Sequence, residues 1–282
     1  MKKRYLFFYL IIILLLMISV STIKQEKEVL ASNEAAINPS AKACIVLDCY
    51  NNEILFEKNI HKKMLPASLT KVLTAYVSIL YYDLNDYVVI THDMINVEGS
   101  KIYLEVGDII SVKDLLYGLM LCSGNDAALA LAYHYSGCLD DFIILMNNVA
   151  KNIGMVNSSF ENPHGLDGIS NNYTTAYDLA LLFSTCLKNN KFREITGTRN
   201  YNTKIYSDKS FYFTNKHRLI KSLDTTTGGK TGYTKKAGRT LITSFKDYFN
   251  EVIVVTLDAY DDWNLHKKLS EYGFSQIKRR DL

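Results

Sequence analysis

The chain has 282 residues, of which 48% are hydrophobic and 22% are charged. This composition is typical of a folded globular protein and excludes a disordered or fibrous chain. The 32 basic and 29 acidic side chains give a net charge of +3, too small to indicate nucleic-acid binding. The sequence contains neither a Cys-x-x-Cys nor a His-Glu-x-x-His motif, so it predicts no metal site.

The first residues carry an export pattern. Met1–Arg4 is basic, and the apolar run Tyr5–Val20 follows it, as in a secretory signal. Residues 1–31 therefore predict a signal peptide or an uncleaved N-terminal membrane anchor. The anchor is the alternative because the apolar run, extended to Ile23, reaches the roughly 20 residues that span a bilayer. Residues 32–39 are predicted to be a linker, and we expect everything after it to be exported.

Residues 40–275 are predicted to form one domain, followed by a short tail at 276–282. Strand patterns occur at Ala43–Asp48, Ile54–Lys58, Phe211–Asn215, Gly229–Tyr233, Thr240–Phe245 and Glu251–Leu257. Helical periodicity occurs at Ser68–Tyr82, Val112–Leu121, Asp126–Tyr135, Leu139–Ile153, Thr175–Leu187, with Thr174 as its N-cap, and Trp263–Tyr272. This order predicts an α+β fold, with an antiparallel sheet of about five strands from both chain ends and a helical lobe. A cleft is expected at the seam between them.

The segment Ser68-Leu69-Thr70-Lys71 places a hydroxyl and an amine three residues apart at a predicted helix start. Side chains with this spacing share one face of a helix. A serine becomes a good nucleophile when a base removes its proton, and a desolvated lysine can be that base. The motif alone is weak evidence, because Ser21-Thr22-Ile23-Lys24 has the same spacing.

Two further motifs occur later in the chain. Ser123-Gly124-Asn125 lies at the break between two apolar helices, and Lys230-Thr231-Gly232 lies in an expected edge strand. Glycines in such a strand let a ligand backbone approach closely. Each motif is common by itself, and Ser170-Asn171-Asn172 repeats the second in a loop. Their joint order, on a helix start, an inter-helix turn and a strand, indicates one functional cleft.

These motifs resemble the SxxK, SxN and KTG elements of the penicillin-recognising serine enzymes. Longer segments resemble the D-alanyl-D-alanine carboxypeptidases, the low-molecular-mass penicillin-binding proteins: Pro66–Lys71, Glu98–Lys101, Asp114–Met120, Asn162–Asp167 and Thr174–Ala180. The resemblance spans about Pro39 to Phe274. It implies a β-lactamase/D,D-peptidase-like fold, with residues 40–275 as the D,D-peptidase catalytic domain. SGN stands where class A β-lactamases have SDN, which weighs against that activity.

The resemblance also implies a mechanism. Ser68 would attack the penultimate D-alanine of a peptidoglycan stem pentapeptide while Lys71 takes its proton, and the terminal D-alanine would leave. Ser123 would relay a proton to the leaving amine with help from Lys230. Water would then hydrolyse the acyl-enzyme, and no metal or organic cofactor is implied.

Substrate binding is implied for a second group of residues. Asn125 would hold the substrate's peptide amide and Thr231 its terminal carboxylate, with Gly232 beside it on the strand. The backbone amide of Tyr233 would complete the oxyanion hole with that of the nucleophile. Many relatives bind the carboxylate with an arginine near the C-terminal helix, where this chain reads Tyr-Asp-Asp-Trp. We expect Arg239 to replace it, and a solvent-exposed strand arginine is the alternative.

The implied partners are stem peptides ending in D-Ala-D-Ala, with β-lactam antibiotics as covalent inhibitors. A β-lactam-binding sensor domain stays open as an alternative, as do a D,D-endopeptidase and a transpeptidase, which share the acyl-enzyme. Many family members continue into a β-rich domain and a membrane helix, whereas only Ser275–Leu282 follows the last predicted helix here. If the enzyme stays on the membrane, the N-terminal segment is expected to hold it there, and the expected location is the extracytoplasmic face of the cell membrane or the cell wall.

Overall fold

The computed structural model describes residues 38–168, 172–206 and 209–280. The predicted signal peptide or anchor at 1–31 lies outside these residues, as do all but the last two positions of the predicted linker. Pro39–Leu282 forms one compact unit. Within the part that the structure describes, no helix is long and apolar enough to cross a membrane.

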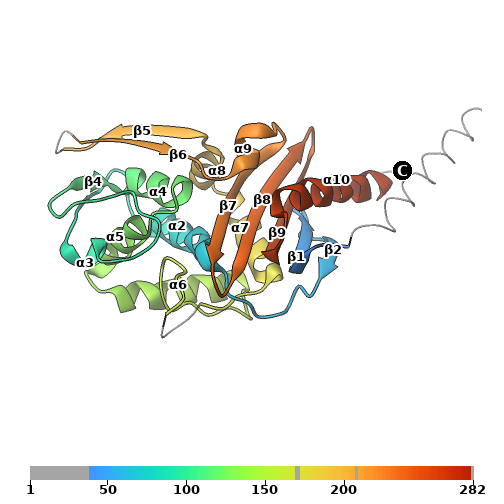
Figure 1. The fold of residues 1–282 in the computed structure, drawn as a ribbon, viewed down its shortest axis with the longest axis horizontal. Helices are drawn as coiled ribbons and strands as arrows, with labels where there is room; N and C mark the ends of the chain where they lie inside the picture. Colours follow the sequence, from blue (N-terminus) through green and yellow to red (C-terminus); the bar gives the residue numbers. More distant parts are fainter. Residues whose placement is uncertain (1–37, 169–171, 207–208, 281–282) are drawn as a thin grey trace, which may run out of the picture. The chain divides into compact units, whose positions relative to one another are not determined.

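The central sheet has five strands in the order β2-β1-β9-β8-β7, and each neighbouring pair is antiparallel (Figure 1). The strands are β1 (Ala41–Asp48), β2 (Ile54–Lys58), β7 (Thr226–Thr234), β8 (Gly238–Asp247) and β9 (Asn250–Ala259). The two ends of the chain meet where β1 pairs with β9. The predicted sheet from both chain ends is therefore confirmed, and β7 is its edge strand, as expected for the Lys-Thr-Gly motif.

The middle strands of the sheet have continuous apolar runs, which are buried on both faces. In β9 every residue from Glu251 to Leu257 is buried, although successive side chains of a strand point to opposite faces. Both faces of the sheet must therefore be covered. The covering contacts come from α10 (Asp262–Arg280), which packs on β8, β9 and β1, and from α7 (Ala176–Leu187), which packs on β9 and β1.

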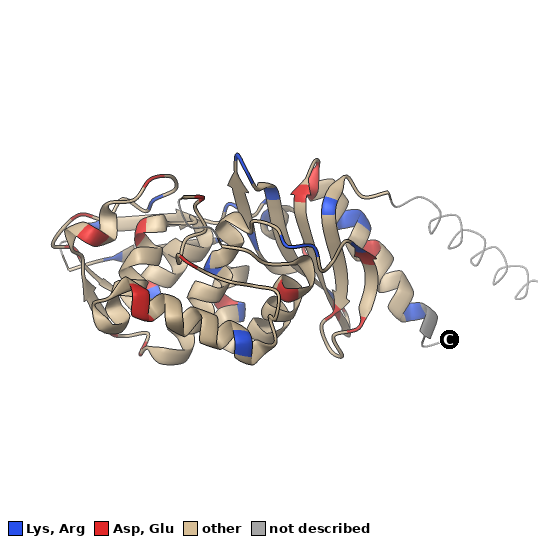
Figure 2. Cartoon of the chain, turned by 90° about the horizontal axis from the view of Figure 1, so that it is seen from below, with Lys and Arg blue, Asp and Glu red and all other residues tan. Residues whose placement is uncertain are grey.

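The helical lobe is formed by the middle of the chain. Its main helices besides α7 are α2 (Thr70–Tyr81), α4 (Val112–Leu121), α5 (Asn125–Ser136) and α6 (Leu139–Ile153). These agree with the predicted helices to within two residues at each end. In α2 most side chains are buried, since it packs against α4, α5, α6 and α7. Charged residues of both signs are interspersed along the chain (Figure 2).

Two helix starts differ from the prediction. Ser68 does not begin the α-helix but lies in a 3-10 turn, Ala67–Leu69 (η1), directly before α2. The N-cap of α7 is Thr175 and not Thr174, because the Thr175 hydroxyl accepts a hydrogen bond from the backbone N–H of Asp178 at 3.0 Å. The backbone of Thr174 instead pairs with Met64.

The strand predicted at Phe211–Asn215 exists but belongs elsewhere. It is β6 (Ser210–Thr214), which pairs with β5 (Asn200–Lys204) in a separate two-stranded sheet. This hairpin packs on α4, where the ring of Tyr201 stacks on Tyr117 at 3.7 Å between centroids. An apolar strand face can be buried against a helix as well as in the main sheet, and the alternating pattern does not distinguish the two.

Several short elements were not predicted: β3 (Tyr87–Val89), α3 (His92–Ile95), β4 (Ile109–Ser111), α8 (Asn190–Gly197) and α9 (Arg218–Ser222). The last helix is also longer than expected, because α10 continues to Arg280 instead of ending near Tyr272. Most of the segment predicted as a tail at 276–282 is therefore helical.

Candidate active site

A cavity of about 340 Å³ lies between β7 and the start of α2. It brings together residues from all three sequence motifs and the predicted arginine: Ser68, Ser123, Thr231, Gly232, Tyr233 and Arg239. Ser68 and Ser123 come from the helical lobe, whereas the other four come from β7 and β8. The cleft therefore lies at the seam that the chain order predicts.

The first pair in the cleft is Ser68 and Lys71. The Lys71 Nζ lies 3.0 Å from the Ser68 Oγ and 2.5 Å from the carbonyl oxygen of His164. Burial lowers the pKa of Lys71 well below its usual range, and the charges of Lys230 and Lys216 lower it further. A fully buried amine without a carboxylate partner favours its neutral form. Lys71 can therefore accept the proton of Ser68.

The loop that contains His164 holds the nucleophile's turn in place. Ala67, directly before Ser68, has a φ of +49°, a conformation that costs energy for a residue with a Cβ. Gly165 lies against it, and a Cβ on Gly165 would come 1.9 Å from the Ala67 carbonyl oxygen. The hydroxyl of Thr70 also donates to this carbonyl at 2.9 Å. Packing therefore maintains the strained turn that exposes Ser68 to the cavity.

The second pair in the cleft is Ser123 and Lys230. The Lys230 Nζ lies 2.9 Å from the Ser123 Oγ and 2.8 Å from the carbonyl oxygen of Thr231. Burial lowers the pKa of Lys230 to about 7, and the charge of Lys216 acts in the same direction. Ser123 has a φ of +62°, another strained position at the break between α4 and α5. This amine can therefore hold or release a proton near neutral pH.

Asn125 and Asp126 fix a loop beside this pair. The Asn125 amide nitrogen donates to the carbonyl oxygen of Glu98 at 2.6 Å, and its backbone N–H donates to that of Ser100 at 2.7 Å. The buried Asp126 carboxylate accepts hydrogen bonds from several backbone N–H groups of the same loop, including that of Ile102 at 3.0 Å. These bonds fix the loop that brings Ser100 to the cavity, whereas Asn125 is buried and is not among the residues that line it.

Gly232 allows β7 to pass close to the nucleophile. A Cβ at this position would lie 2.9 Å from the backbone nitrogen of Ser68 and 2.4 Å from the Thr240 hydroxyl oxygen. A residue with a side chain would therefore push the strand away. The close approach brings the backbone of Tyr233 near that of Ser68, as an oxyanion hole made of these two amides requires.

Arg239 is held by Asp262 at the start of α10. Its Nε lies 3.1 Å from one carboxylate oxygen, and its Nη2 lies 2.8 Å from the other. The Asp262 side chain is only 4% exposed, whereas that of Arg239 is 48% exposed. A bidentate pair with a buried carboxylate fixes the orientation of the guanidinium. Arg239 is thus a solvent-exposed strand arginine, as in the alternative, whose guanidinium is held at the cavity by Asp262.

Six further residues line the cavity and were not assigned from the sequence: Ser100, Lys216, Arg218, Thr240, Asp262 and Trp263. Lys216 and Arg218 are exposed, whereas Asn215 and His217, which alternate with them, are buried. Lys216 donates to the hydroxyl of Ser100 at 3.1 Å, and the Arg218 guanidinium lies 5.9 Å from the Trp263 ring centroid. The sequence Asn-Lys-His-Arg is polar throughout, so it gave no signal for this alternation.

No cluster of His, Cys, Asp and Glu side chains that could hold a metal ion occurs among the described residues. The cavity is lined by three serine hydroxyls and three cations, Lys216, Arg218 and Arg239, and a buried amine lies beside each of two of the serines. This combination suits a nucleophile, a proton relay and an anionic substrate group.

Comparison with known proteins agrees with this chemistry. A family model described as D-alanyl-D-alanine carboxypeptidase matches residues 28–261. D-alanyl-D-alanine carboxypeptidase DacF of Bacillus subtilis is 33% identical over 250 residues, which are 86% of this chain and 64% of the relative. DacC of Escherichia coli is 36% identical over 254 residues, 83% of this chain and 61% of the relative. The chain thus spans less than two thirds of the length of these relatives.

Solved structures give the same answer for the fold. A D-alanyl-D-alanine carboxypeptidase from Mycobacterium tuberculosis is 28% identical with a TM-score of 0.81, covering 84% of this chain and 92% of that one. The Streptomyces K15 DD-transpeptidase is 29% identical with a TM-score of 0.79, covering 84% of this chain and 98% of that one. These matches confirm the D,D-peptidase-like fold. The chain belongs to the D-alanyl-D-alanine carboxypeptidase family.

Proposed function

We propose that this chain is a serine-type D-Ala-D-Ala carboxypeptidase that removes the terminal D-alanine from peptidoglycan stem pentapeptides. The observation that carries the proposal is the buried Lys71 amine, 3.0 Å from the Ser68 hydroxyl, in a cavity shared with the second lysine–serine pair. Family membership and the names of the relatives support the substrate class. The catalytic domain of the proposal is the segment predicted at 40–275.

Acylation begins at Ser68. The neutral amine of Lys71 takes the hydroxyl proton while the Ser68 Oγ attacks the carbonyl carbon of the penultimate D-alanine. The carbonyl oxygen becomes an oxyanion, which the backbone amides of Ser68 and Tyr233 stabilise. Each such donor contributes about 3 kcal/mol to transition-state stabilisation.

The second pair serves the leaving group. When the C–N bond breaks, the terminal D-alanine leaves as an amine that needs one proton. Ser123 donates its hydroxyl proton and is reprotonated by Lys230, which lies 2.9 Å away. The proton that Lys71 took from Ser68 then passes to Lys230, which restores the neutral base and the protonated donor. Lys71 next takes a proton from the water that attacks the ester, and this proton goes to the Ser68 Oγ as its bond to the acyl carbon breaks and the shortened stem peptide leaves.

Substrate binding uses fixed groups around this centre. Asn125 holds the peptide amide, and Gly232 allows the substrate backbone to approach β7. The terminal carboxylate binds to the hydroxyl of Thr231 and to Arg239, whose outer edge remains available because Asp262 occupies its Nε side. Arg239 from β8 thus fills the role of the arginine that this chain lacks at the start of α10.

The same acyl-enzyme explains the other proposed partners and the site of action. β-Lactam antibiotics would acylate Ser68 because their strained amide carbonyl offers the same target. The apolar N-terminal segment supports export to the extracytoplasmic face of the membrane, where peptidoglycan lies. Uncleaved, the same segment would attach the enzyme to the membrane.

Release of D-alanine is the direct test of the function. We expect the protein from residue 32 onward to release free D-alanine from a D-Ala-D-Ala pentapeptide, and Ser68→Ala to release none above background. Equal release by both proteins would contradict the assignment. A second reaction contains an amine acceptor that competes with water for the acyl-enzyme. If more acyl group is transferred to the acceptor than is hydrolysed, the enzyme is a transpeptidase.

Removal of the Arg239 guanidinium should weaken substrate binding. We expect Arg239→Ala to raise KM for a D-Ala-D-Ala peptide by about 10-fold or more, because a charge-assisted hydrogen bond to the carboxylate is lost. Asp262→Asn should have a smaller effect in the same direction, since it only loosens the guanidinium. Steady-state kinetics measure both, and an unchanged kcat/KM in Arg239→Ala would show that this residue does not bind the carboxylate.

The pH profile should reveal Lys230. In the proposed mechanism Lys230 must carry a proton, so kcat/KM falls as pH rises through its pKa. Burial lowers that pKa from the ordinary 10.5 to about 7, so the alkaline decline should begin well below pH 10.5. Lys230→Arg keeps its charge throughout and should lose this decline, although its maximal rate is lower. An alkaline limb that is the same in Lys230→Arg would assign it to another group.

A further inference from the structure

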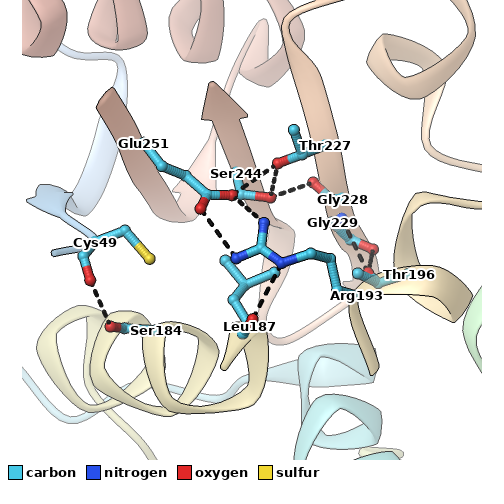
Figure 3. A network of polar contacts seen from close by, with 10 residues as sticks. All are labelled: Cys49, Ser184, Leu187, Arg193, Thr196, Thr227, Gly228, Gly229, Ser244 and Glu251. Carbon is cyan, nitrogen blue, oxygen red and sulfur yellow. Dashed lines mark hydrogen bonds and ion pairs between the residues drawn. The ribbon is translucent and has the colours of Figure 1, made fainter. Parts of the chain in front are cut away.

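The outer edge of β7 is covered at one position by a side chain from α8. β7 is the last strand of its sheet, so one of its edges has no strand partner in that sheet. The Thr196 hydroxyl accepts a hydrogen bond from the N–H of Gly229 and donates one to the carbonyl oxygen of the same residue, both at 3.1 Å (Figure 3). One buried hydroxyl thus replaces a strand partner for Gly229.

Gly229 shares its edge of the strand with two residues of the cleft. Backbone N–H and C=O groups of successive residues in a strand point to opposite edges, so those of every second residue point to the same edge. Those of Thr231 and Tyr233 therefore point to the same edge as those of Gly229, and both residues line the cavity. Lys230 is the next residue after Gly229. Thr196 thus fixes the strand edge directly before the catalytic segment.

Glycines permit this close packing of α8 on β7. A Cβ on Gly228 would lie 2.5 Å from the Thr196 methyl carbon, and a Cβ on Gly197 would lie 2.5 Å from the carbonyl oxygen of Thr227. Either added carbon would force the helix and the strand apart. The close contact therefore depends on a glycine in the strand and a glycine in the helix.

An ion pair anchors α8 one turn earlier. Arg193 contacts both carboxylate oxygens of Glu251, at 2.6 and 3.0 Å, and also donates to the carbonyl oxygen of Leu187 at 3.1 Å (Figure 3). The Glu251 side chain is 6% exposed, and it accepts a further bond from the hydroxyl of Thr227 at 3.1 Å. Strand β9, the end of α7 and the start of β7 are thus tied to the helix that carries Thr196.

We propose that Thr196 is a positioning residue for Lys230, acting by fixing the peptide unit of Gly229 that precedes it. The inference rests on the proposed function of Lys230. Displacing Gly229 would move the Lys230 backbone and lengthen its 2.9 Å contact with Ser123. It would also admit water to a buried amine.

The titratable groups around Lys230 come from several elements. Lys71 lies on α2, Cys122 at the end of α4, and Lys216 and His217 before α9. Burial lowers the pKa of His217 to about 3, so it is neutral at physiological pH. None of these four groups bonds to Thr196, so a change at Thr196 reaches Lys230 through the strand and not through a removed charge.

The test compares Thr196→Ser with Thr196→Ala, because both lack the methyl group and they differ only in the hydroxyl. The measurement is the rate constant for acylation by a fluorescent penicillin, as a function of pH. We expect Thr196→Ser to stay within about 2-fold of the wild type and Thr196→Ala to fall by about 10-fold, as for the loss of hydrogen bonds to a buried peptide unit. In Thr196→Ala the alkaline limb should also move to higher pH, because a better hydrated Lys230 holds its proton longer.

Thr198 provides the matched control. It lies two residues later, and its hydroxyl donates to the carbonyl oxygen of Glu194 at 2.7 Å, within its own chain segment. Thr198→Ser and Thr198→Ala should show equal rates and pH profiles. Wild-type enzyme that is acylated by penicillin but releases no D-alanine would contradict the proposed function and leave the threonine comparison interpretable.

Two results would overturn the inference. One is equal rates and pH profiles for Thr196→Ser and Thr196→Ala, with both folded according to their melting temperatures. The other is a slower Thr196→Ala enzyme with an unmoved alkaline limb, which would indicate a general loss of structure. If Thr196→Ala does not fold, Thr196→Val is compared with the wild type, because valine keeps the methyl group of threonine and replaces only the hydroxyl. Failure of both to fold would make Thr196 structural and not positioning.

Discussion

A buried amine that has to stay uncharged is the constraint on which the cleft depends. Lys71 is 0% exposed and contacts the Ser68 hydroxyl and a carbonyl oxygen, but no carboxylate of the described residues. Burying a charge without a partner is very unfavourable, so the site holds the amine in the form that accepts protons. Lys230 is buried nearby, and each lysine disfavours a charge on the other. In the proposed mechanism the pair therefore divides into a base, Lys71, and a proton donor, Lys230.

This arrangement requires two structural units to meet within hydrogen-bonding distance. The nucleophile and its base lie on the turn and helix of the lobe, whereas Lys230 lies on the edge strand of the sheet. Gly165 and Gly232 let backbone segments approach where a Cβ would collide. Strained backbone at Ala67 persists because this packing outweighs its cost. Gly232 is therefore needed where the edge strand passes the turn of the nucleophile, and Gly165 where a loop of the lobe packs on the same turn.

The cleft residues Ser68, Ser123 and Thr231 were predictable because three local motifs occur in one order along the chain. Ser68 and Lys71 stand three residues apart, and the strand of Lys230 reads as an edge strand from its glycines. The central strands were predictable from continuous apolar runs. The bidentate pair of Arg239 and Asp262 joins a strand to a helix, and Thr196 contacts Gly229 across 33 positions. Such long-range contacts leave no periodic pattern. Short helices such as α8 also lack enough turns for a recognisable apolar face.

Locating the acyl group tests the central claim most directly. After incubation with penicillin at neutral pH, proteolytic peptides analysed by mass spectrometry should carry one adduct, on the peptide that contains Ser68. The time course in Lys71→Ala should be slower by about 100-fold or more, because general-base catalysis is lost. An adduct on another residue, or equally fast acylation of Lys71→Ala, would contradict a mechanism in which a neutral buried lysine activates this serine.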